Sequence, residues 1–205
     1  MRFGRLLRSA CLFEDVVKVI CTCNVGWRQT VAMVERIVEH WGVPTADGRT
    51  RGFPTPRRLA EVPAEELRRL ARVGYRASFI HDLARAVADS SLDLDDLEHF
   101  DGPPADCYRR LRKIRGVGDY AASHLCMLLG DYSRLAVDTE MVRLMRRRYP
   151  RKRLTPATIG VLYRRWHPYQ YLAYWHELWS DYVRRHGRSD LWSPAVIGPR
   201  ITTAN

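Results

Sequence analysis

Apolar residues recur at intervals of three and four along most of the chain, which is the spacing of one face of an α-helix. A first run of this kind covers Phe13 to Ile20, and a second covers Val31 to Trp41, where Gly42 ends it. Residues 23–26 interrupt the pattern between the two runs. No segment alternates convincingly between apolar and polar residues, so the pattern predicts an all-α fold.

Local start and stop signals divide the rest of the chain into further helices. Thr55-Pro56 and Thr155-Pro156 each place a capping threonine before a proline of the first helical turn. We expect loops at residues 43–53 and 101–104, and a polar tail at 188–205. Other helices are expected at about residues 63–71, 75–88, 105–114, 120–129, 139–148 and 168–186.

Length and charge narrow the class of protein. The chain has 205 residues and is 46% hydrophobic, which suits one compact domain or two small lobes that share a core. Its formal net charge is +11, and its isoelectric point is about 9.9. This balance favours a polyanionic partner, nucleic acid first and an anionic membrane surface second, although a basic protein without such a partner has the same composition.

Other classes of protein do not fit the sequence. No stretch approaches about 18 uncharged apolar residues, so we expect no membrane span. The apolar stretch Ala10 to Phe13 follows basic residues, but Glu14 and Asp15 end it, and it is too short for a signal peptide. The five cysteines are odd in number and include no C-x2-C pair. We therefore expect reduced thiols, with Cys126 in a core, rather than a zinc site or a disulfide framework.

The stretch Ile114 to Gly118 reads I-R-G-V-G and lies between two expected helices. Its two glycines allow positive φ and let another backbone approach closely. The amides of such a hairpin and of the next helix form a nest for anions that fits a DNA phosphate. The pattern indicates either a helix-hairpin-helix that grips the DNA backbone or an ordinary turn between helices.

Asp138 follows the second hairpin glycine by 20 residues and directly precedes an expected helix. An aspartate there is ordinarily an N-cap, and the amides and dipole of the helix favour its ionised form. A fixed anion also suits cleavage of an N-glycosidic bond, because positive charge then develops on the deoxyribose. The two roles are compatible, so Asp138 is the candidate catalytic residue.

The hairpin and the aspartate together resemble the helix-hairpin-helix/Gly-Pro-Asp (HhH-GPD) DNA glycosylases of base excision repair. The resemblance covers about residues 12–185, and it includes the family's V-D-T sequence at 137–139. Residues 12–37 and 73–87 are similar to the 8-oxoguanine glycosylase branch, and W-H-P-Y at 166–169 is similar to the start of the family's last helix.

The resemblance implies roles for further residues. Asn24 would fill the gap left by an extruded nucleotide, Tyr75 would wedge into the base stack, and Arg76 would contact the orphaned base. The hairpin would hold phosphate, with a K⁺ or Na⁺ at its carbonyls. Its DNA-binding residues would be Ile114, Gly116, Val117 and Gly118, and Arg143 would also bind DNA. The pocket for the flipped base would contain Trp27, Tyr120, His124, Tyr174 and Leu178.

Several of these assignments have a structural alternative. Aromatic residues crowd 163–182, where packing in a core competes with stacking on a base. His124 could donate a proton to the leaving base or be an ordinary helix residue. The basic run at 143–153 could contact phosphate or form a solvated face.

Departures from the family pattern bear on the chemistry. Bifunctional members carry a lysine at the position of Tyr120, and tyrosine cannot form the imine that a lyase needs. Glu140 replaces a histidine that lies near the damaged nucleotide's phosphate, and it would repel phosphate unless it turned away or paired with an arginine. Tyr174 and Leu178 replace the glutamine and phenylalanine that read and stack on 8-oxoguanine. We therefore expect a monofunctional enzyme, and the excised base stays open among alkylated purines, an oxidised base, and uracil or thymine in a mismatch.

The resemblance also predicts how the domain is organised. We expect one domain at 12–187, with a central lobe at 28–136 and a second lobe made of 12–27 and 137–187, between terminal extensions at 1–11 and 188–205. No cysteine follows Asp138, so no iron–sulfur cluster is expected, and no N-terminal β-domain fits before residue 12.

The sequence therefore predicts a monofunctional DNA glycosylase that hydrolyses the N-glycosidic bond of a flipped, damaged or mismatched base. We expect a monomer that binds double-stranded DNA and no membrane, in the cytoplasm with the nucleoid of a bacterium or in the nucleus or an organelle of a eukaryote. The alternatives are a non-catalytic damage sensor or structural DNA-binding protein on the same fold, and a helical domain that binds membranes or proteins.

Overall fold

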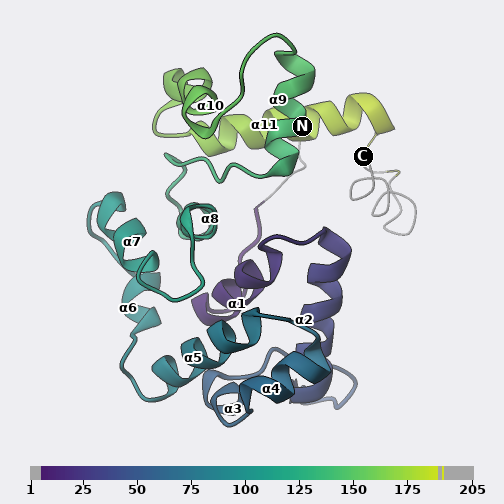
Figure 1. The fold of residues 1–205 in the computed structure, drawn as a ribbon, viewed down its shortest axis with the longest axis vertical. Helices are drawn as coiled ribbons and strands as arrows, with labels where there is room; N and C mark the ends of the chain where they lie inside the picture. Colours follow the sequence, from purple (N-terminus) through teal and green to yellow (C-terminus); the bar gives the residue numbers. More distant parts are fainter. Residues whose placement is uncertain (1–5, 189–190, 192–205) are drawn as a thin grey trace. The chain divides into compact units, whose positions relative to one another are not determined.

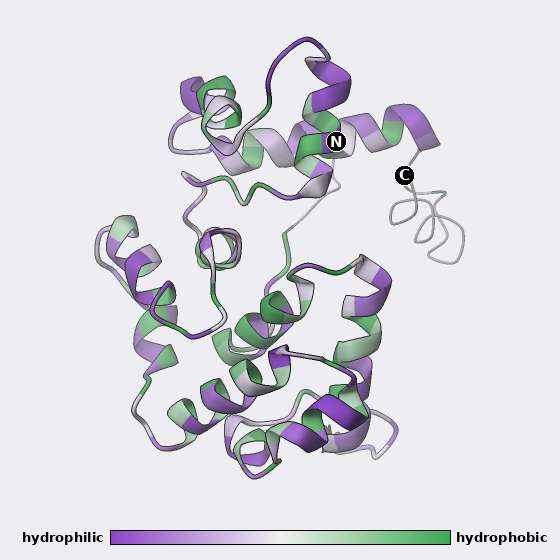
Figure 2. Ribbon diagram, viewed as in Figure 1, coloured by the Kyte–Doolittle hydropathy of each residue, from purple (hydrophilic) through white to green (hydrophobic). Residues whose placement is uncertain are grey.

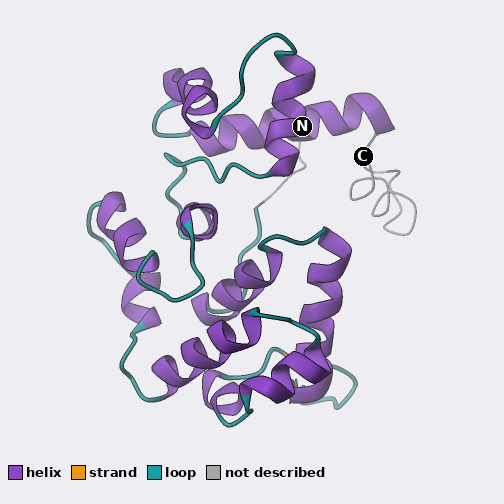
Figure 3. Cartoon of the chain, in the orientation of Figure 1, coloured by secondary structure: helices purple, strands orange, loops and turns teal. Residues whose placement is uncertain are grey.

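In the computed structural model, residues 6–188 and 191 are described. They form an all-α fold in which helices and their connecting loops make up nearly the whole of this part of the chain (Figure 1, Figure 3). The α-helices are α1 (Leu12–Thr22), α2 (Trp27–Trp41), α3 (Pro56–Ala60), α4 (Ala64–Glu66), α5 (Arg76–Ala88), α6 (Leu94–Glu98), α7 (Pro104–Leu111), α8 (Asp119–Leu128), α9 (Thr139–Arg148), α10 (Pro156–Tyr163) and α11 (Gln170–His186). The shorter elements are β1 (Val43–Pro44), β2 (Arg51–Gly52), the π-helix η1 (Leu67–Ala71) and the 3-10 helix η2 (Arg164–Trp166).

The capping signals in the sequence mark real helix starts. The Thr55 hydroxyl accepts a hydrogen bond from the Arg58 amide at 3.3 Å, at the start of α3. The Thr155 hydroxyl accepts one from the Thr158 amide at 3.2 Å, at the start of α10. A proline follows each threonine, where its missing N–H costs no hydrogen bond.

The structure differs from the prediction in three places. β1 and β2 pair antiparallel, Val43 with Gly52 and Pro44 with Arg51, within a segment that was expected to be a loop. The helix expected at 63–71 is divided into α4 and the π-helical η1. Helix α6 was not predicted at all. The predicted tail at 188–205 lies outside the described residues, apart from 188 and 191.

Contacts divide the chain into two compact units, residues 8–121 and residues 122–205 with 1–7. In the first unit, α1 packs against α2, α5 and α6, and α3 packs against α5. Figure 2 shows α1 as a largely hydrophobic helix. The fully buried side chains of this unit include Val16, Val17, Ile20, Ile37, Leu59, Leu67, Ile80 and Leu111.

In the second unit, α11 packs against α9 and α10. The buried apolar and aromatic side chains of these three helices form its core. They include Met141, Leu144, Met145, Ile159, Tyr163, Tyr171, Tyr174, Leu178 and Tyr182. The core of this unit is therefore unusually rich in tyrosine.

The two units do not coincide with the two expected lobes. Residues 12–27 were expected to join the C-terminal part of the chain, and the boundary was expected at residue 136. The buried face of α1 instead packs within the unit 8–121, and the boundary lies inside α8. The physical reason is that α1 buries its apolar face against neighbours from its own half of the sequence.

Candidate functional site

The I-R-G-V-G stretch forms a tight hairpin between α7 and α8. The Ile114 amide donates to the Leu111 carbonyl at 3.1 Å, and the Val117 amide donates to the Ile114 carbonyl at 3.0 Å. The side chains of Ile114 and Val117 are buried. These two residues can therefore face a ligand only with their main chain, which is the part of the hairpin that would hold a phosphate.

Gly116 is required by the packing of the hairpin on α5. Its φ is +89°, in the left-handed region, and a Cβ there would lie 2.6 Å from Cδ2 of Phe79. Arg115 reinforces the same contact, because its guanidinium pairs with Asp82 and lies 5.2 Å from the centre of the Phe79 ring. The hairpin is thus fixed to α5 by a close approach, a ring contact and an ion pair.

Gly118 differs from Gly116, because it does not use the positive φ that a glycine allows. Its φ is outside the left-handed region, and a Cβ at residue 118 would meet nothing closer than Nη1 of Arg112, at 4.0 Å. No contact within the described residues requires a glycine here. Close approach of a ligand to this backbone remains the predicted reason for Gly118.

Two hairpin carbonyls, at the place where the resemblance implies a monovalent cation, already accept hydrogen bonds. The Val117 carbonyl already accepts a hydrogen bond from Nη1 of Arg112 at 2.8 Å, and the Ile114 carbonyl accepts one from the Val117 amide. Arg112 also pairs with Asp119 at 3.0 Å, and each carbonyl oxygen keeps a second lone pair, so the cation stays a prediction. Within residues 6–188 and 191, no group of three or more His, Cys, Asp or Glu side chains could hold a metal ion.

Asn24 and Tyr75 contact each other in the structure, while the roles that the resemblance gives them stay predictions. Asn24 has a φ of +56°, and its Nδ2 donates to the Tyr75 hydroxyl at 3.1 Å. The Tyr75 side chain remains 50% exposed, and the guanidinium of Arg76 lies 4.5 Å from the centre of its ring. An exposed aromatic ring held from two sides is suited to insertion between bases.

Arg76 does not have the exposure that its expected role requires. Only 5% of the residue is exposed. Its guanidinium donates to the carbonyls of Ile20 at 3.2 Å and Val73 at 3.3 Å, and also to that of Cys23. These bonds satisfy carbonyls at the end of α1 and before α5. Arg76 therefore positions Tyr75 and the end of α1, and direct contact with an orphaned base does not fit its burial.

Asp138 caps α9, as expected from its place in the sequence. Its φ and ψ are −114° and −177°, and its Oδ1 accepts a hydrogen bond from the Met141 amide at 2.7 Å. This bond fixes the carboxylate at the positive end of the helix dipole.

The electrostatics of Asp138 correct the expectation that capping keeps its pKa low. Burial raises the pKa of Asp138 above the ordinary aspartate value, and the neighbouring Glu140 carboxylate adds to the rise. The hydrogen bond from the Met141 amide lowers the pKa but does not compensate for burial. Asp138 is therefore a desolvated carboxylate that protonates more readily than a surface aspartate.

Glu140 is paired rather than free. Its Oε1 accepts a hydrogen bond from Arg143, and its Oε2 accepts one from the Tyr182 hydroxyl at 2.8 Å. The negative charge that the sequence placed near a phosphate is thus offset by an arginine. The pairing also occupies one end of the Arg143 guanidinium, so contact between Arg143 and DNA stays a prediction.

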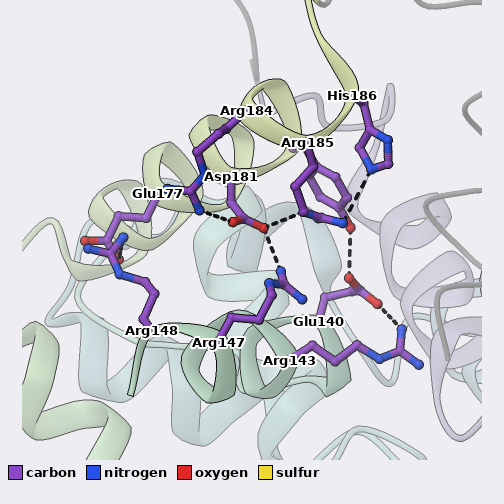
Figure 4. A network of polar contacts seen from close by, with 10 residues as sticks. Glu140, Arg143, Arg147, Arg148, Glu177, Asp181, Arg184, Arg185 and His186 are labelled. Atoms are coloured by element: carbon purple, nitrogen blue, oxygen red, sulfur yellow. Dashed lines mark hydrogen bonds and ion pairs between the residues drawn. The ribbon is translucent and has the colours of Figure 1, made fainter. Parts of the chain in front are cut away.

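The basic run on α9 is not simply a solvated face. Figure 4 shows Arg147 and Arg148 directed toward acidic side chains of α11, and Arg143 directed toward Glu140 of α9 itself. Arg148 pairs with Glu177 at 3.3 Å, and Arg147 pairs with Asp181 at 2.7 Å. Asp181 also pairs with Arg184 and Arg185 of its own helix.

The role of Asp181 was not predicted from the sequence. The available signal was its spacing of three and four residues from Arg184 and Arg185, which places opposite charges on one helix face. The spacing did not reveal that Asp181 is only 3% exposed or that α9 supplies a third arginine.

The residues expected in the base pocket fall into both units of the chain. Tyr174 is 2% exposed, Leu178 is buried, and the ring of His124 meets that of Tyr171 edge-on at 6.5 Å. Burial, followed by the negative charge of Asp138, holds the pKa of Tyr174 well above its usual value. Trp27 and Tyr120 belong to the unit 8–121, and Trp27 is 60% exposed. The complete pocket remains a prediction.

None of the helices in the described part of the chain is long and apolar enough to cross a membrane. The five cysteines, all in the described part of the chain, form no disulfide, and Cys126 is buried as expected. Burial also raises the pKa of the Cys21 thiol to about 12, which leaves it unreactive near neutral pH.

Comparison with known proteins supplies both sequence and fold relatives. The putative DNA-3-methyladenine glycosylase YfjP of Bacillus subtilis (strain 168) is 31% identical over 116 residues, which are 57% of this chain and 39% of that protein. The 8-oxoguanine glycosylase/lyase of Clostridium acetobutylicum, in complex with double-stranded DNA that contains cytosine opposite 8-oxoguanine, matches with a TM-score of 0.75 and 22% identity, over 90% of this chain and 63% of that one.

A second structure has a similar fold. The 3-methyladenine DNA glycosylase Mag1 of Schizosaccharomyces pombe, in complex with abasic DNA, matches with a TM-score of 0.71 and 16% identity, over 91% of this chain and 89% of that one. The chain thus spans less than two thirds of the Bacillus and Clostridium proteins. Residues 17–166 match the model of the HhH-GPD superfamily of base excision DNA repair proteins. Because that match covers more than half of the sequence, the chain belongs to the HhH-GPD superfamily of base excision DNA repair proteins.

Proposed function

We propose that this protein is a monofunctional DNA glycosylase that hydrolyses the N-glycosidic bond of a damaged or mismatched base flipped out of double-stranded DNA. The observation that carries the proposal is the state of Asp138, a desolvated carboxylate held by the Met141 amide at the start of α9. The complexes of the Clostridium and S. pombe proteins with DNA support the choice of substrate polymer.

The proposed mechanism uses the charge of Asp138 directly. As the bond between base and sugar breaks, C1′ and the ring oxygen of the deoxyribose gain positive charge, and an ionised carboxylate beside them lowers the barrier. A carboxylate that is partly removed from water acts more strongly on a nearby charge than an exposed one does. The same carboxylate orients the water that attacks C1′, so the products are a free base and an abasic site.

Tyr120 accounts for the expected lack of lyase activity. A lyase needs an amine that attacks C1′ and forms an imine, and the phenol of tyrosine cannot do so. Borohydride added during the reaction should therefore trap no covalent protein–DNA adduct with the wild-type protein. A trapped adduct would show that another amine of the chain acts as a nucleophile and would refute the monofunctional assignment.

Alkylated purines are the first substrates to test. The B. subtilis relative bears the name of a 3-methyladenine glycosylase. A ring-alkylated purine can carry positive charge, which aromatic faces attract. Of the residues expected in the base pocket, Trp27 offers an accessible aromatic ring, since it is 60% exposed, whereas Tyr174 is buried in the core. Oxidised bases and uracil or thymine mismatches complete the panel.

The test compares the wild-type protein with Asp138→Asn on duplexes that contain each of these lesions, with released bases identified by mass spectrometry. Asparagine keeps an oxygen for the Met141 amide but removes the charge, so excision should fall by about 100-fold or more. Unchanged excision in Asp138→Asn would refute the catalytic assignment. If the wild-type protein releases no base but binds abasic DNA tightly, it is instead a damage sensor.

A further inference from the structure

A solvent-accessible hollow of about 350 Å³ lies where α2 begins and the turn before α5 passes. It is contained within the unit 8–121. Its volume falls in the range of small-ligand pockets, about 300–1,000 Å³. Val25, Arg28, Gln29, Ala32, Met33, Arg36, Arg72, Gly74 and Arg76 line it.

The hollow is strongly basic. Four of its lining residues are arginines, and none is acidic. The described residues include no ion-pair partner for Arg28, Arg36 or Arg72, whereas Arg112 and Arg115 of the same unit pair with aspartates. Like charges that share a small volume without a counter-charge repel one another, and a bound anion removes that repulsion.

Arg76 has a different part in the hollow. Its guanidinium is bonded to three main-chain carbonyls and is buried. It therefore forms part of the wall, and the three unpaired arginines are the ones that can turn toward a ligand. Gln29 adds a neutral donor, because its Oε1 accepts the Gly26 amide at 3.3 Å and its Nε2 has no partner in the described chain.

Backbone strain concentrates at the edge of the hollow. Three described residues other than glycine have positive φ, and two of them are here: Arg72 at +55° lines it, and Asn24 at +56° precedes the lining residue Val25. Such conformations cost free energy and are retained where the surroundings or a function require them. The strain at Arg72 turns a charged side chain out of η1 at the hollow.

We propose that this hollow binds a phosphodiester of the DNA duplex through Arg28, Arg36 and Arg72, with the adjoining sugar against Val25, Ala32 and Met33. The proposal rests on the proposed function, because it takes DNA as the substrate polymer. Its chemistry is that of a phosphate clamp: guanidinium groups bind phosphate oxygens in bidentate geometry. The site is separate from the hairpin at 114–118 and adds a second hold on the backbone.

The test measures binding to a duplex with a tetrahydrofuran abasic analogue at increasing KCl. Each arginine that contacts a phosphate contributes about one unit to the slope of log K against log salt concentration. Arg28→Gln, Arg36→Gln and Arg72→Gln combined should make the slope shallower by about two to three units. The matched control, Arg57→Gln, Arg58→Gln and Arg85→Gln, removes the same charge from exposed arginines outside the hollow and should change the slope by less than about one unit.

Neutral methylphosphonates, placed one at a time along each strand, identify the phosphate. At the bound position the methylphosphonate should weaken DNA binding by the wild-type protein and should not change DNA binding by the triple hollow variant. Whether that position lies in the lesion strand or the opposite strand decides which strand the hollow holds. If no position in either strand distinguishes the two proteins, the clamp is overturned.

The outcomes separate this inference from the proposed function. If the wild-type protein excises a base but the hollow and control variants have equal slopes, the clamp is wrong and the enzyme assignment stands. If no base is excised but the hollow variant alone has a shallower slope of log K against log salt concentration, the clamp is supported and the enzyme assignment is wrong. Thermal unfolding of the triple variant is the check on folding, and its midpoint should equal or exceed that of the wild type, because the substitutions remove repulsion.

Discussion

Asp138 combines two demands that pull its pKa in opposite directions. As the cap of α9 it accepts the Met141 amide, which favours the ionised form, but its burial disfavours that form and has the larger effect. The folded protein therefore holds this negative charge at a cost in stability. A residue that destabilises the fold in the ionised state needed for the proposed reaction is typical of catalytic sites.

The first prediction concerns Asp138→Asn and pH. In the unfolded chain the aspartate has its ordinary pKa, 3.8, and in the folded chain the pKa is higher. Protonation thus favours folding, and this contribution is lost as pH rises from 3.8 through the folded pKa. The variant has no such loss, so its melting temperature relative to the wild type should increase between about pH 4 and about pH 7. A relative melting temperature that falls over this range would contradict the cited shift.

The two hairpin glycines provide a second prediction. Gly116→Ala forces a Cβ to within 2.6 Å of Phe79 at a φ of +89°, so it should destabilise the protein by about 2 kcal/mol or more. Gly118→Ala meets no close atom and needs no positive φ, so its effect on stability should stay within about 1 kcal/mol.

The affinity for DNA distinguishes the two substitutions further. Gly118→Ala should weaken binding to abasic DNA although the protein folds normally, because the methyl group obstructs approach to the backbone amides. Urea unfolding and fluorescence anisotropy measure the two effects. Normal binding by Gly118→Ala would remove phosphate approach as the reason for this glycine.

At the scale of elements, α9 and α11 are joined by charge as well as by their buried faces. Burial alone would raise the pKa of Asp181, but Arg147, Arg185 and Arg184 outweigh it and lower the pKa. The carboxylate of α11 thereby holds one arginine from α9 and two from its own helix (Figure 4). Removing it would leave three positive charges facing one another.

The third prediction follows from this arrangement. Asp181→Asn should destabilise the protein by about 1–3 kcal/mol at neutral pH, less than for a fully buried pair because the arginines reach solvent. Since the folded pKa is lowered, the contribution is present above the ordinary aspartate pKa and is lost as pH falls through the folded value. The control Asp95→Asn alters an exposed residue of α6 and should have almost no effect. Equal stability of both variants in urea would show that the Asp181 carboxylate does not stabilise the packing of α9 against α11.

Sequence patterns predicted the elements whose signals are local. The helices that start at Thr55-Pro56, Asp138 and Thr155-Pro156 are where expected, because caps and first-turn prolines act within one turn. Helix α6 and the β1–β2 pair are too short to produce a periodicity. The π-helical η1 depends on packing against α2, which no local pattern encodes.

In the candidate site, too, only the features that depend on local sequence could be predicted. Asp138 as a cap followed from its position before an expected helix, and the cap is present. The contact between Asn24 and Tyr75 was not predicted, because the two residues are far apart in the sequence. The burial of Arg76 and the raised pKa of Asp138 could not be predicted, because both depend on which residues surround a side chain in three dimensions. The unpaired arginines of the hollow come from α2 and from the turn after η1, and they are apart in the sequence.

At the scale of the whole molecule, a net charge of +11 governs the first encounter with a polyanion. The fourth prediction is a steep dependence of duplex affinity on salt. With six or more phosphate contacts, affinity should fall by about 1,000-fold between about 50 mM and 200 mM salt. Titration of undamaged and abasic duplexes over this range measures it. A flat dependence would favour the membrane-binding or protein-binding reading of the basic composition.

The hydrogen bond between Asn24 and Tyr75 joins side chains that lie 51 residues apart in the sequence. Because the pair is already held together before any duplex arrives, little conformational entropy remains to be lost when the ring enters a helix. A preorganised Tyr75 ring would push against base pairs rather than change its own conformation to fit them. Base pairs that stack weakly would therefore open first. The search for damage would begin with weak stacking, before the protein contacts any chemical feature of the base.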